Sequence, residues 1–162
     1  SAGTATNKGV EAELTIKPAS WLSVFGNIGY IDGGLDDKPR NAANFRGAKF
    51  RLQPDVQAAA GFTIDAPLGG VTFFATPSVT YRSKIFFEIP NNNLISQEAV
   101  TLVNINAGFR FGQDRFEVAA FARNLLNEDY LLDAGNTGGA FGIPTFIPAE
   151  PRLYGIRVGA KF

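Results

Sequence analysis

The sequence of 162 residues contains no cysteine, histidine or methionine, and Trp21 is its single tryptophan. Without cysteine, these residues hold no disulfide, no thiolate nucleophile and no zinc–thiolate site. Without histidine, they hold no Ser-His-Asp triad, no histidine metal cluster and no imidazole that titrates near neutral pH. We therefore expect no enzyme activity, no cofactor and no bound metal.

An excess of charge of one sign and a long apolar run are also absent. The 15 Lys and Arg residues balance 15 Asp and Glu residues, and the isoelectric point is near 6.2. Because a nucleic-acid partner requires a basic surface, this balance predicts no such partner. No run approaches the roughly 20 apolar residues of a membrane helix. Residues 1–4 show no signal-peptide pattern, so we expect none there.

The sequence does contain apolar residues at every second position, the pattern of strands with two unlike faces. The clearest segment is 103–111, in which apolar side chains alternate with asparagine, glycine and arginine. Seven segments follow this pattern: 10–17, 22–30, 56–64, 71–82, 103–111, 116–123 and 154–162. Pro77 lies inside the fourth segment and lacks a backbone donor, which predicts a bulge or irregular pairing there.

The connections between these segments alternate in length. Short turns are predicted at 17–20, 65–70 and 112–114, and long polar connections at 32–54, 83–98 and 125–152. Short turns at one end and long loops at the other are typical of outer-membrane barrels, so the first strand is expected to run inward. Around 112–114, Phe111 is expected to face Phe116, and Arg110 to face Glu117 as an ion pair.

Aromatic residues lie near both ends of the predicted apolar faces. Near the short turns and the end of the chain these are Phe62, Phe73, Phe111, Phe116 and Phe162, and near the long loops they are Tyr30, Tyr81 and Tyr154. Two aromatic bands suit a lipid-facing surface, where the rings meet lipid headgroups. The alternative is the core of a soluble sandwich, although a core more often places its largest side chains at mid-strand.

Seven strands do not close a membrane barrel, because bacterial barrels have even strand numbers and open edges are costly in hydrocarbon. Residues 45–52 are either an eighth strand or, as we favour, an extension of the third strand. The predicted fold class is all-β: an antiparallel up-and-down transmembrane β-barrel, with about seven strands of a larger barrel in this chain. The alternatives are an autonomous eight-stranded outer-membrane barrel with a structural or adhesin role, and an outer-membrane enzyme, which the lack of histidine disfavours.

Three sequence motifs, one near the start of the chain and two near its end, resemble motifs of a known family in type and order. They are Asn-Lys-Gly-Val-Glu-Ala-Glu-Leu at 7–14, Arg-Asn-Leu-Leu-Asn-Glu-Asp-Tyr at 123–130, and Glu-Pro-Arg-Leu-Tyr-Gly at 150–155, which leads to the final Lys-Phe. Together they resemble the late strands of TonB-dependent outer-membrane receptors. The resemblance implies that residues 1–162 are the C-terminal segment of a plugged barrel of about 22 strands. It also implies a barrel-assembly signal formed by Tyr154, Ile156, Val158 and Phe162.

The resemblance further implies a function and partners. Receptors of this family reside in the bacterial outer membrane and import scarce nutrients such as ferric siderophores, cobalamin or sugars. The implied partners are outer-membrane lipid, the rest of the barrel with its plug, and a small-molecule ligand. The inner-membrane TonB complex would act through a segment outside these residues.

Ligand in such a barrel would meet the outer loops and the upper lumen. The candidate residues are the cationic, amide and aromatic side chains of the three long connections: Arg40, Arg46, Lys49, Arg51, Arg82, Lys84, Asn91, Asn92, Asn93, Tyr130, Asn136 and Phe141. Cationic side chains suit a carboxylate- or catecholate-rich anion, and the alternative is that they are solvated loop residues. Residues 32–37 lack the spacing of a calcium loop, and residues 135–142 lack the lysine of a phosphate loop.

Overall fold

The computed structural model describes residues 4–37, 43–138 and 143–161, and in these ranges the chain forms strands and two short 3₁₀ turns. The strands are β1 (Ala5–Ala19), β2 (Leu22–Leu35), β3 (Val56–Pro67), β4 (Val71–Ala75), β5 (Ser78–Arg82), β6 (Ile85–Phe86), β7 (Ser96–Gln97), β8 (Val100–Phe111), β9 (Phe116–Arg123), β10 (Leu131–Gly138), β11 (Ile143–Pro148) and β12 (Leu153–Ala160). The 3₁₀ turns are η1 (Ala43–Phe45) and η2 (Asn93–Ile95).

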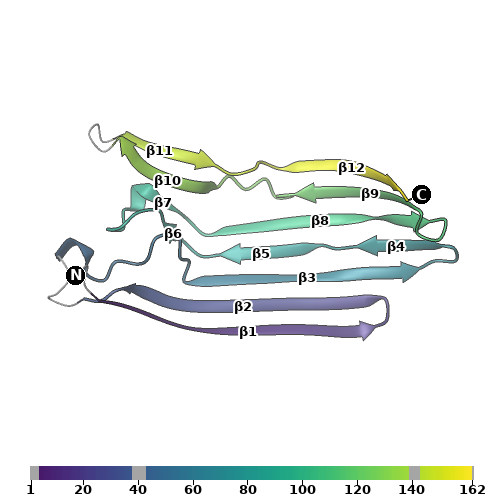
Figure 1. Ribbon diagram of the computed structural model, residues 1–162, viewed down its shortest axis with the longest axis horizontal. Coiled ribbons are helices and arrows are strands. Elements are labelled where there is room, and N and C mark those ends of the chain that lie inside the picture. Colours follow the sequence, from purple (N-terminus) through teal and green to yellow (C-terminus); the bar gives the residue numbers. More distant parts are fainter. Residues whose placement is uncertain (1–3, 38–42, 139–142, 162) are drawn as a thin grey trace.

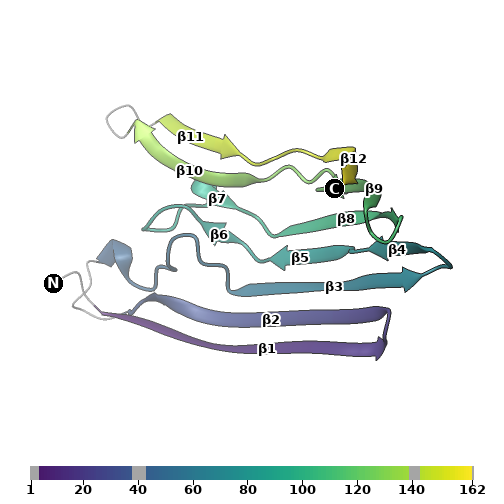
Figure 2. The same cartoon turned by 45° about the vertical axis from the view of Figure 1, so that its right-hand side comes forward.

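The main sheet is antiparallel and has the order β1-β2-β3-β4-β8-β9-β12. Strand β5 lies in line with β4 and pairs with the same two neighbours, β3 and β8, so the sheet has seven strand positions. Neighbours in the sheet follow one another along the chain, and the prediction of an antiparallel up-and-down arrangement is confirmed. The turned view shows the side with β9 and β12 curling away from the plane of β1 to β3 (Figure 2).

The two ends of the sheet differ as the loop lengths predicted. Residues 20–21, 68–70 and 112–115 form the short connections at one end, which we call the turn end. The other end, the loop end, carries the first (36–55), second (83–99) and third (124–152) long loops. In Figure 1, β1 begins at the loop end, where β6, β7, β10 and β11 also lie, whereas β12 finishes at the turn end.

Strand pairing gathers the apolar residues of all seven positions on one face. Val10 on β1 pairs with Tyr30 on β2, and Tyr30 pairs with Val56 on β3. Apolar residues continue to pair with apolar residues across the sheet, as far as Val118 on β9 and Val158 on β12. Val158 is 75% exposed, and many other large residues of this apolar face are exposed too, among them Val10 at 69% and Ile28 at 53%. Because no second layer of the described chain packs against this face, a sandwich core is excluded.

The ladder is interrupted at Pro77, as its position predicted. Residues 76 and 77 separate β4 from β5, yet Ile64 pairs with Ala75 and Gly61 with Ser78 in one continuous register. The predicted irregularity is therefore confirmed, but it is a gap and not a bulge. The Thr76 amide donates to the Asn106 carbonyl at 2.7 Å, which keeps β8 attached across the gap.

The hairpin between β8 and β9 has the predicted register with a different ion pairing. Phe111 pairs with Phe116 and their rings stack at 5.5 Å, and Arg110 lies opposite Glu117. The Arg110 guanidinium, however, donates to Asp65 at 2.6 Å, and Glu117 accepts hydrogen bonds from Arg157. The expected ion pair of Arg110 with Glu117 is wrong, because Arg110 reaches over the Phe74 ring of β4 to Asp65 on β3, and Glu117 binds the diagonal Arg157 of β12.

The long loops hold structure that the strand pattern did not predict. Residues 45–52 are neither an eighth strand nor an extension of β3, because their one ladder contact is an isolated bridge between Gly34 and Lys49. Instead, β1 and β2 continue outward to Ala5 and Leu35. The second loop contains the β6–β7 hairpin, and the third loop contains the β10–β11 hairpin.

Gly108 marks the closest approach of two strands on the polar face. A Cβ at this position would overlap the carbonyl oxygen of Val118 and would lie 2.6 Å from the Cα of Ala119. Both atoms belong to the backbone of β9 and cannot move without disturbing the ladder. By contrast, a Cβ at Gly29, on the polar face of β2, meets nothing within 4 Å.

We expect Gly108→Ala to destabilise the folded sheet by about 1–3 kcal/mol, because overpacking forces a backbone shift. Gly29→Ala is the matched control and should be neutral or slightly stabilising, because alanine loses less conformational entropy in a strand. Urea unfolding of the whole protein in detergent micelles measures both variants. Equal stability of the two variants would contradict the close approach at Gly108.

Candidate functional site

The loop end has a small hydrophobic core of its own. Ile85, Phe87, Ile95 and Ala134 are buried together, and Leu131 packs against them. Phe87 is 2% exposed. These residues come from the β6–β7 hairpin, the segment between its strands, and β10, so the second and third long loops share one packed centre. The loops therefore form a defined surface over the end of the sheet.

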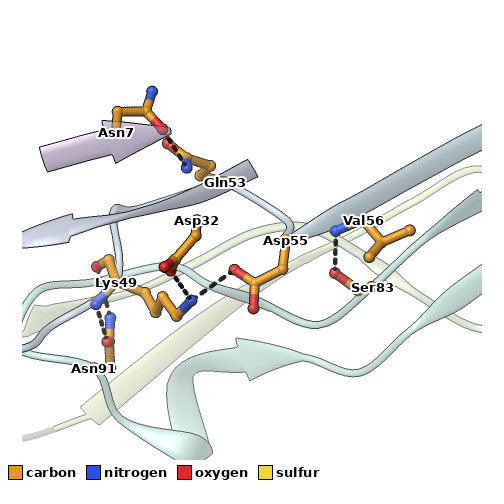
Figure 3. A network of polar contacts seen from close by, with 8 residues as sticks. All are labelled: Asn7, Asp32, Lys49, Gln53, Asp55, Val56, Ser83 and Asn91. Carbon is orange, nitrogen blue, oxygen red and sulfur yellow. Dashed lines mark hydrogen bonds and ion pairs between the residues drawn. The ribbon is translucent and has the colours of Figure 1, made fainter. Parts of the chain in front are cut away.

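Lys49 is the centre of a polar network that joins the first long loop to β2 and to Asp55, the last loop residue before β3. Its ammonium group donates to Asp55 at 3.0 Å and to Asp32 at 3.2 Å (Figure 3). The hydrogen bond to Asp55 raises the pKa of Lys49 above its usual value, with a further contribution from Asp32. Lys49 therefore stays charged and holds two carboxylates that would otherwise repel each other.

Asn91 ties the second long loop to the first. Its carboxamide oxygen accepts from the Lys49 amide at 2.6 Å, and its nitrogen donates to the Lys49 carbonyl at 3.0 Å. The two bonds pair one side chain with one residue of backbone, in the manner of a short strand contact (Figure 3). Ser83 ties the second loop to β3 by accepting from the Val56 amide at 3.0 Å.

Arg51 ties the first long loop to the third. One terminal guanidinium nitrogen lies 2.9 and 3.0 Å from the two carboxylate oxygens of Asp133 on β10. This hydrogen bond lowers the pKa of Asp133 below its ordinary value. In the second loop, Lys84 donates to Glu98 at 2.7 Å and to Asn93 at 2.9 Å. Several of the predicted ligand residues thus bind one another in the structure.

Arg82 and Tyr130 meet at a hollow on the polar face, directly below the loops. The guanidinium carbon of Arg82 lies 5.5 Å from the centre of the Tyr130 ring, and Arg82 donates to the Leu131 carbonyl at 3.2 Å. The hollow has a volume of about 380 Å³, and its lining includes Asn27, Gln57, Thr80, Arg82, Tyr130 and Leu132. A cation, amides, a hydroxyl and an aromatic ring converge here, which suits a polar, anionic small molecule with flat groups.

The remaining predicted site residues are not all drawn together. Arg46 is exposed in the first long loop, and Asn92 accepts from the Leu94 amide at 3.0 Å at the start of η2. Arg40 and Phe141 lie outside the described residues, and so does the side chain of Asn136. The hollow therefore unites two of the predicted residues, Arg82 and Tyr130.

The predicted assembly signal lies on the outermost strand. Tyr154, Ile156 and Val158 on β12 are 74%, 77% and 75% exposed, all on the apolar face. Phe162 lies outside the described residues. In the sheet order, β12 pairs only with β9, so its other edge is free among the described strands.

The described residues contain no group of three or more acidic, histidine or cysteine side chains placed to hold a metal ion. In the acidic segment 32–37, Asp32 accepts from Lys49 and Asp36 accepts from the Thr6 hydroxyl at 2.7 Å. No helix in these ranges has the length and apolar character needed to cross a membrane.

Sequence reasoning missed one buried polar residue at this end, Asn124. It is 5% exposed, has a φ of 48°, and makes hydrogen bonds to both ends of the third long loop. A signal is present in the sequence Asn-Leu-Leu-Asn at 124–127, because asparagine is among the non-glycine residues enriched at positive φ. The sequence motif by itself supports the family resemblance and predicts no role for Asn124.

An antiparallel wall with an apolar face, a polar face, short turns and long packed loops defines a membrane β-barrel segment. The family described as "TonB dependent receptor-like, beta-barrel" matches residues 1–125. The chain therefore belongs to the TonB-dependent receptor β-barrel family. No curated protein matches the sequence.

Solved structures share the fold of this chain at low sequence identity. The ferric yersiniabactin uptake receptor FyuA from Yersinia pestis superposes with a TM-score of 0.86 at 17% identity, over 99% of this chain and 24% of the receptor. The ferric preacinetobactin receptor BauA from Acinetobacter baumannii gives 0.73 at 21% identity, over 98% and 22%. The siderophore receptor PiuA from Acinetobacter baumannii gives 0.70 at 17% identity, over 98% and 22%. The chain thus spans about a quarter of the length of these receptors.

The Arg51–Asp133 contact predicts a specific response to pH. Because the pKa of Asp133 is lowered in the folded state, the ion pair stabilises the contact between the first and third long loops at pH values above the ordinary aspartate pKa. This stabilisation is lost as the pH falls through the lowered pKa of Asp133. We expect Arg51→Gln to raise the pKa of Asp133 toward its ordinary value. Carboxyl ¹³C NMR of labelled protein measures this pKa. The control variant Arg152→Gln removes an equal charge that does not contact Asp133. If the pKa of Asp133 rises as much in Arg152→Gln as in Arg51→Gln, Arg51 is not the cause of its lowered value.

Proposed function

We propose that this chain is the C-terminal part of the barrel wall of a bacterial outer-membrane receptor that takes up a ferric siderophore-like nutrient. The family match carries the proposal, because this family consists of receptor barrels. The three structural neighbours add support, since two are described as receptors for a ferric complex and the third as a siderophore receptor. Cobalamin and sugars remain the other ligand classes to test.

The open sheet supports a place in a larger barrel. β1 and β12 stand at opposite ends of the strand order and do not pair with each other in the described chain. Unpaired backbone groups cost several kcal/mol each in hydrocarbon, so both edges require neighbouring strands in a membrane. This favours a wall segment over an autonomous eight-stranded barrel with a structural or adhesin role.

The proposed contacts follow from the two faces. The apolar face would meet outer-membrane lipid, and the polar face would line the lumen beside a plug contributed by the rest of the protein. The inner-membrane TonB complex would act through that missing part. Tyr154, Ile156, Val158 and Phe162 would form the barrel-assembly signal on the strand that closes the barrel.

The proposed ligand contacts lie at the loop end. Arg82 and Tyr130 come first, because they share the hollow on the polar face. The residues Arg40, Arg46, Arg51 and Asn92 are proposed as outer contacts in the loops. A guanidinium with spare donors binds carboxylates and catecholates well. Arg51 would have to exchange Asp133 for a ligand, whereas the contacts of Arg82 among the described residues are a neutral carbonyl and a ring.

Uptake of ⁵⁵Fe tests this function in the bacterium that makes the whole receptor. Deletion of the gene should abolish uptake of at least one complex from a panel that includes ferric yersiniabactin and ferric preacinetobactin. Arg82→Gln should weaken binding of that complex roughly tenfold or more, the effect of losing a hydrogen bond to a charged group. Arg152→Gln, outside the hollow, should leave it unchanged.

Two results would count against the proposal in different ways. If deletion leaves uptake of every ferric complex intact, the ligand class is wrong, and cobalamin and sugar uptake are then measured in the same strain. If Arg82→Gln binds normally while the receptor is present in normal amount, the hollow is not the ligand site.

A further inference from the structure

We propose that Asn124 is the positioning residue of the third long loop: its carboxamide clamps the two ends of the loop together and so holds Tyr130 and Leu132 over the hollow. This inference rests on the proposed function only in treating the hollow as the ligand site. The clamp itself is a property of this chain and is tested without any ligand.

The Asn124 side chain bonds to both ends of the loop. Its nitrogen donates to the Glu128 carbonyl at 2.9 Å and to the Glu150 carbonyl at 3.3 Å. Its oxygen accepts from the Glu128 amide at 2.8 Å. Glu128 follows the start of the loop and Glu150 precedes β12, so one buried carboxamide joins the outgoing and returning chain.

Asparagine suits this clamp for a chemical reason. The contact needs one acceptor facing an amide and two donors facing carbonyls, which a primary carboxamide supplies from its oxygen and its NH₂ group. Aspartate would place an acceptor opposite the carbonyls of Glu128 and Glu150, and an aliphatic residue would leave buried backbone groups without partners.

The backbone of Asn124 fixes the clamp to the barrel wall. Its amide donates to the side-chain oxygen of Asn104 on β8 at 3.0 Å, and the next amide, of Leu125, donates to the Val103 carbonyl at 2.8 Å. The positive φ of 48° then turns the chain out of β9, and a bond from the Asn127 amide to the Asn124 carbonyl at 2.9 Å closes the turn. The clamp is thus anchored on β8 and β9.

The clamp is the first rung of a ladder that runs out along the loop. Beyond the carboxamide, the Ala149 amide donates to the Tyr130 carbonyl at 2.9 Å. Leu131 then pairs with Pro148, which begins the β10–β11 hairpin. Leu131 is also held by Arg82 and Gln97, so these bonds fix the middle of the segment while Asn124 fixes the distance between the two chains at its base.

The test compares two glycine substitutions within one turn of the whole receptor. Asn124 and Asn127 both have positive φ, 48° and 58°, and glycine adopts this conformation without strain. Asn124→Gly therefore removes the clamp and keeps the turn. Asn127→Gly is the matched control, because its side chain is exposed. A nitroxide on Leu132→Cys reports on the loop, and one on Val118→Cys reports on the wall, in a receptor without other accessible cysteines.

In Asn124→Gly we expect the rotational correlation time of the label at 132 to fall about twofold or more, as the loop gains nanosecond motion. The label at 118 and the heat-modifiable gel shift of the folded barrel should not change. Asn127→Gly should leave both labels as they are. A purely structural role in barrel stability would instead alter the label at 118 or the gel shift.

The inference is overturned if the label at 132 keeps its correlation time in Asn124→Gly, or if Asn127→Gly mobilises it equally. It is also overturned if the label at 118 changes together with that at 132. These measurements are made without siderophore, so a negative result in the ferric uptake experiment does not affect them. Conversely, a negative result for the clamp does not contradict the proposed uptake function.

Discussion

The constraint on which the rest of the structure depends is the constant parity of strand pairing across seven positions. A slip of one residue at any pair would turn every later strand over and place charged side chains on the apolar face. The gap at Pro77 shows how strictly parity is kept, because β4 and β5 resume the same register on both neighbours after the interruption. The turns that join the strands, such as the positive-φ turn at 112–114, preserve this register.

This constraint explains why the sheet was predictable from the sequence. Period-two alternation is a local signal, and a membrane wall enforces it on both faces, so segment 103–111 could be placed in β8 with its hairpin partner. The loop end follows no such period. Its ties join residues that are far apart in the chain, as with Lys49 and Asn91 or Arg51 and Asp133, separated by 42 and 82 positions. No spacing rule relates such residues, and the two-residue strands β6 and β7 are too short to show alternation.

The candidate site was predictable in part for a related reason. Residue type identified cations and amides in the loops, but it could not separate side chains that meet a ligand from side chains that hold the loops together. Lys49 and Lys84 have carboxylate partners within the chain, as does Arg51. Arg82 contacts a carbonyl and a ring, which leaves its charge without a carboxylate partner among the described contacts. That difference, visible only in three dimensions, makes Arg82 the strongest candidate.

The same contacts indicate how the loop end can move. An exposed ion pair such as Arg51–Asp133 adds little to stability because water screens its charges, so it can break at little cost. The buried core around Phe87 is different, because separating it exposes apolar surface at roughly 25 cal/mol per Å². The second and third loops share this core, so they should stay together when the ion pairs and hydrogen bonds between the loops break. The described part of the first loop contributes no residue to this core and is tied to the other loops by polar contacts such as Lys49 with Asn91, so it is the loop expected to move independently.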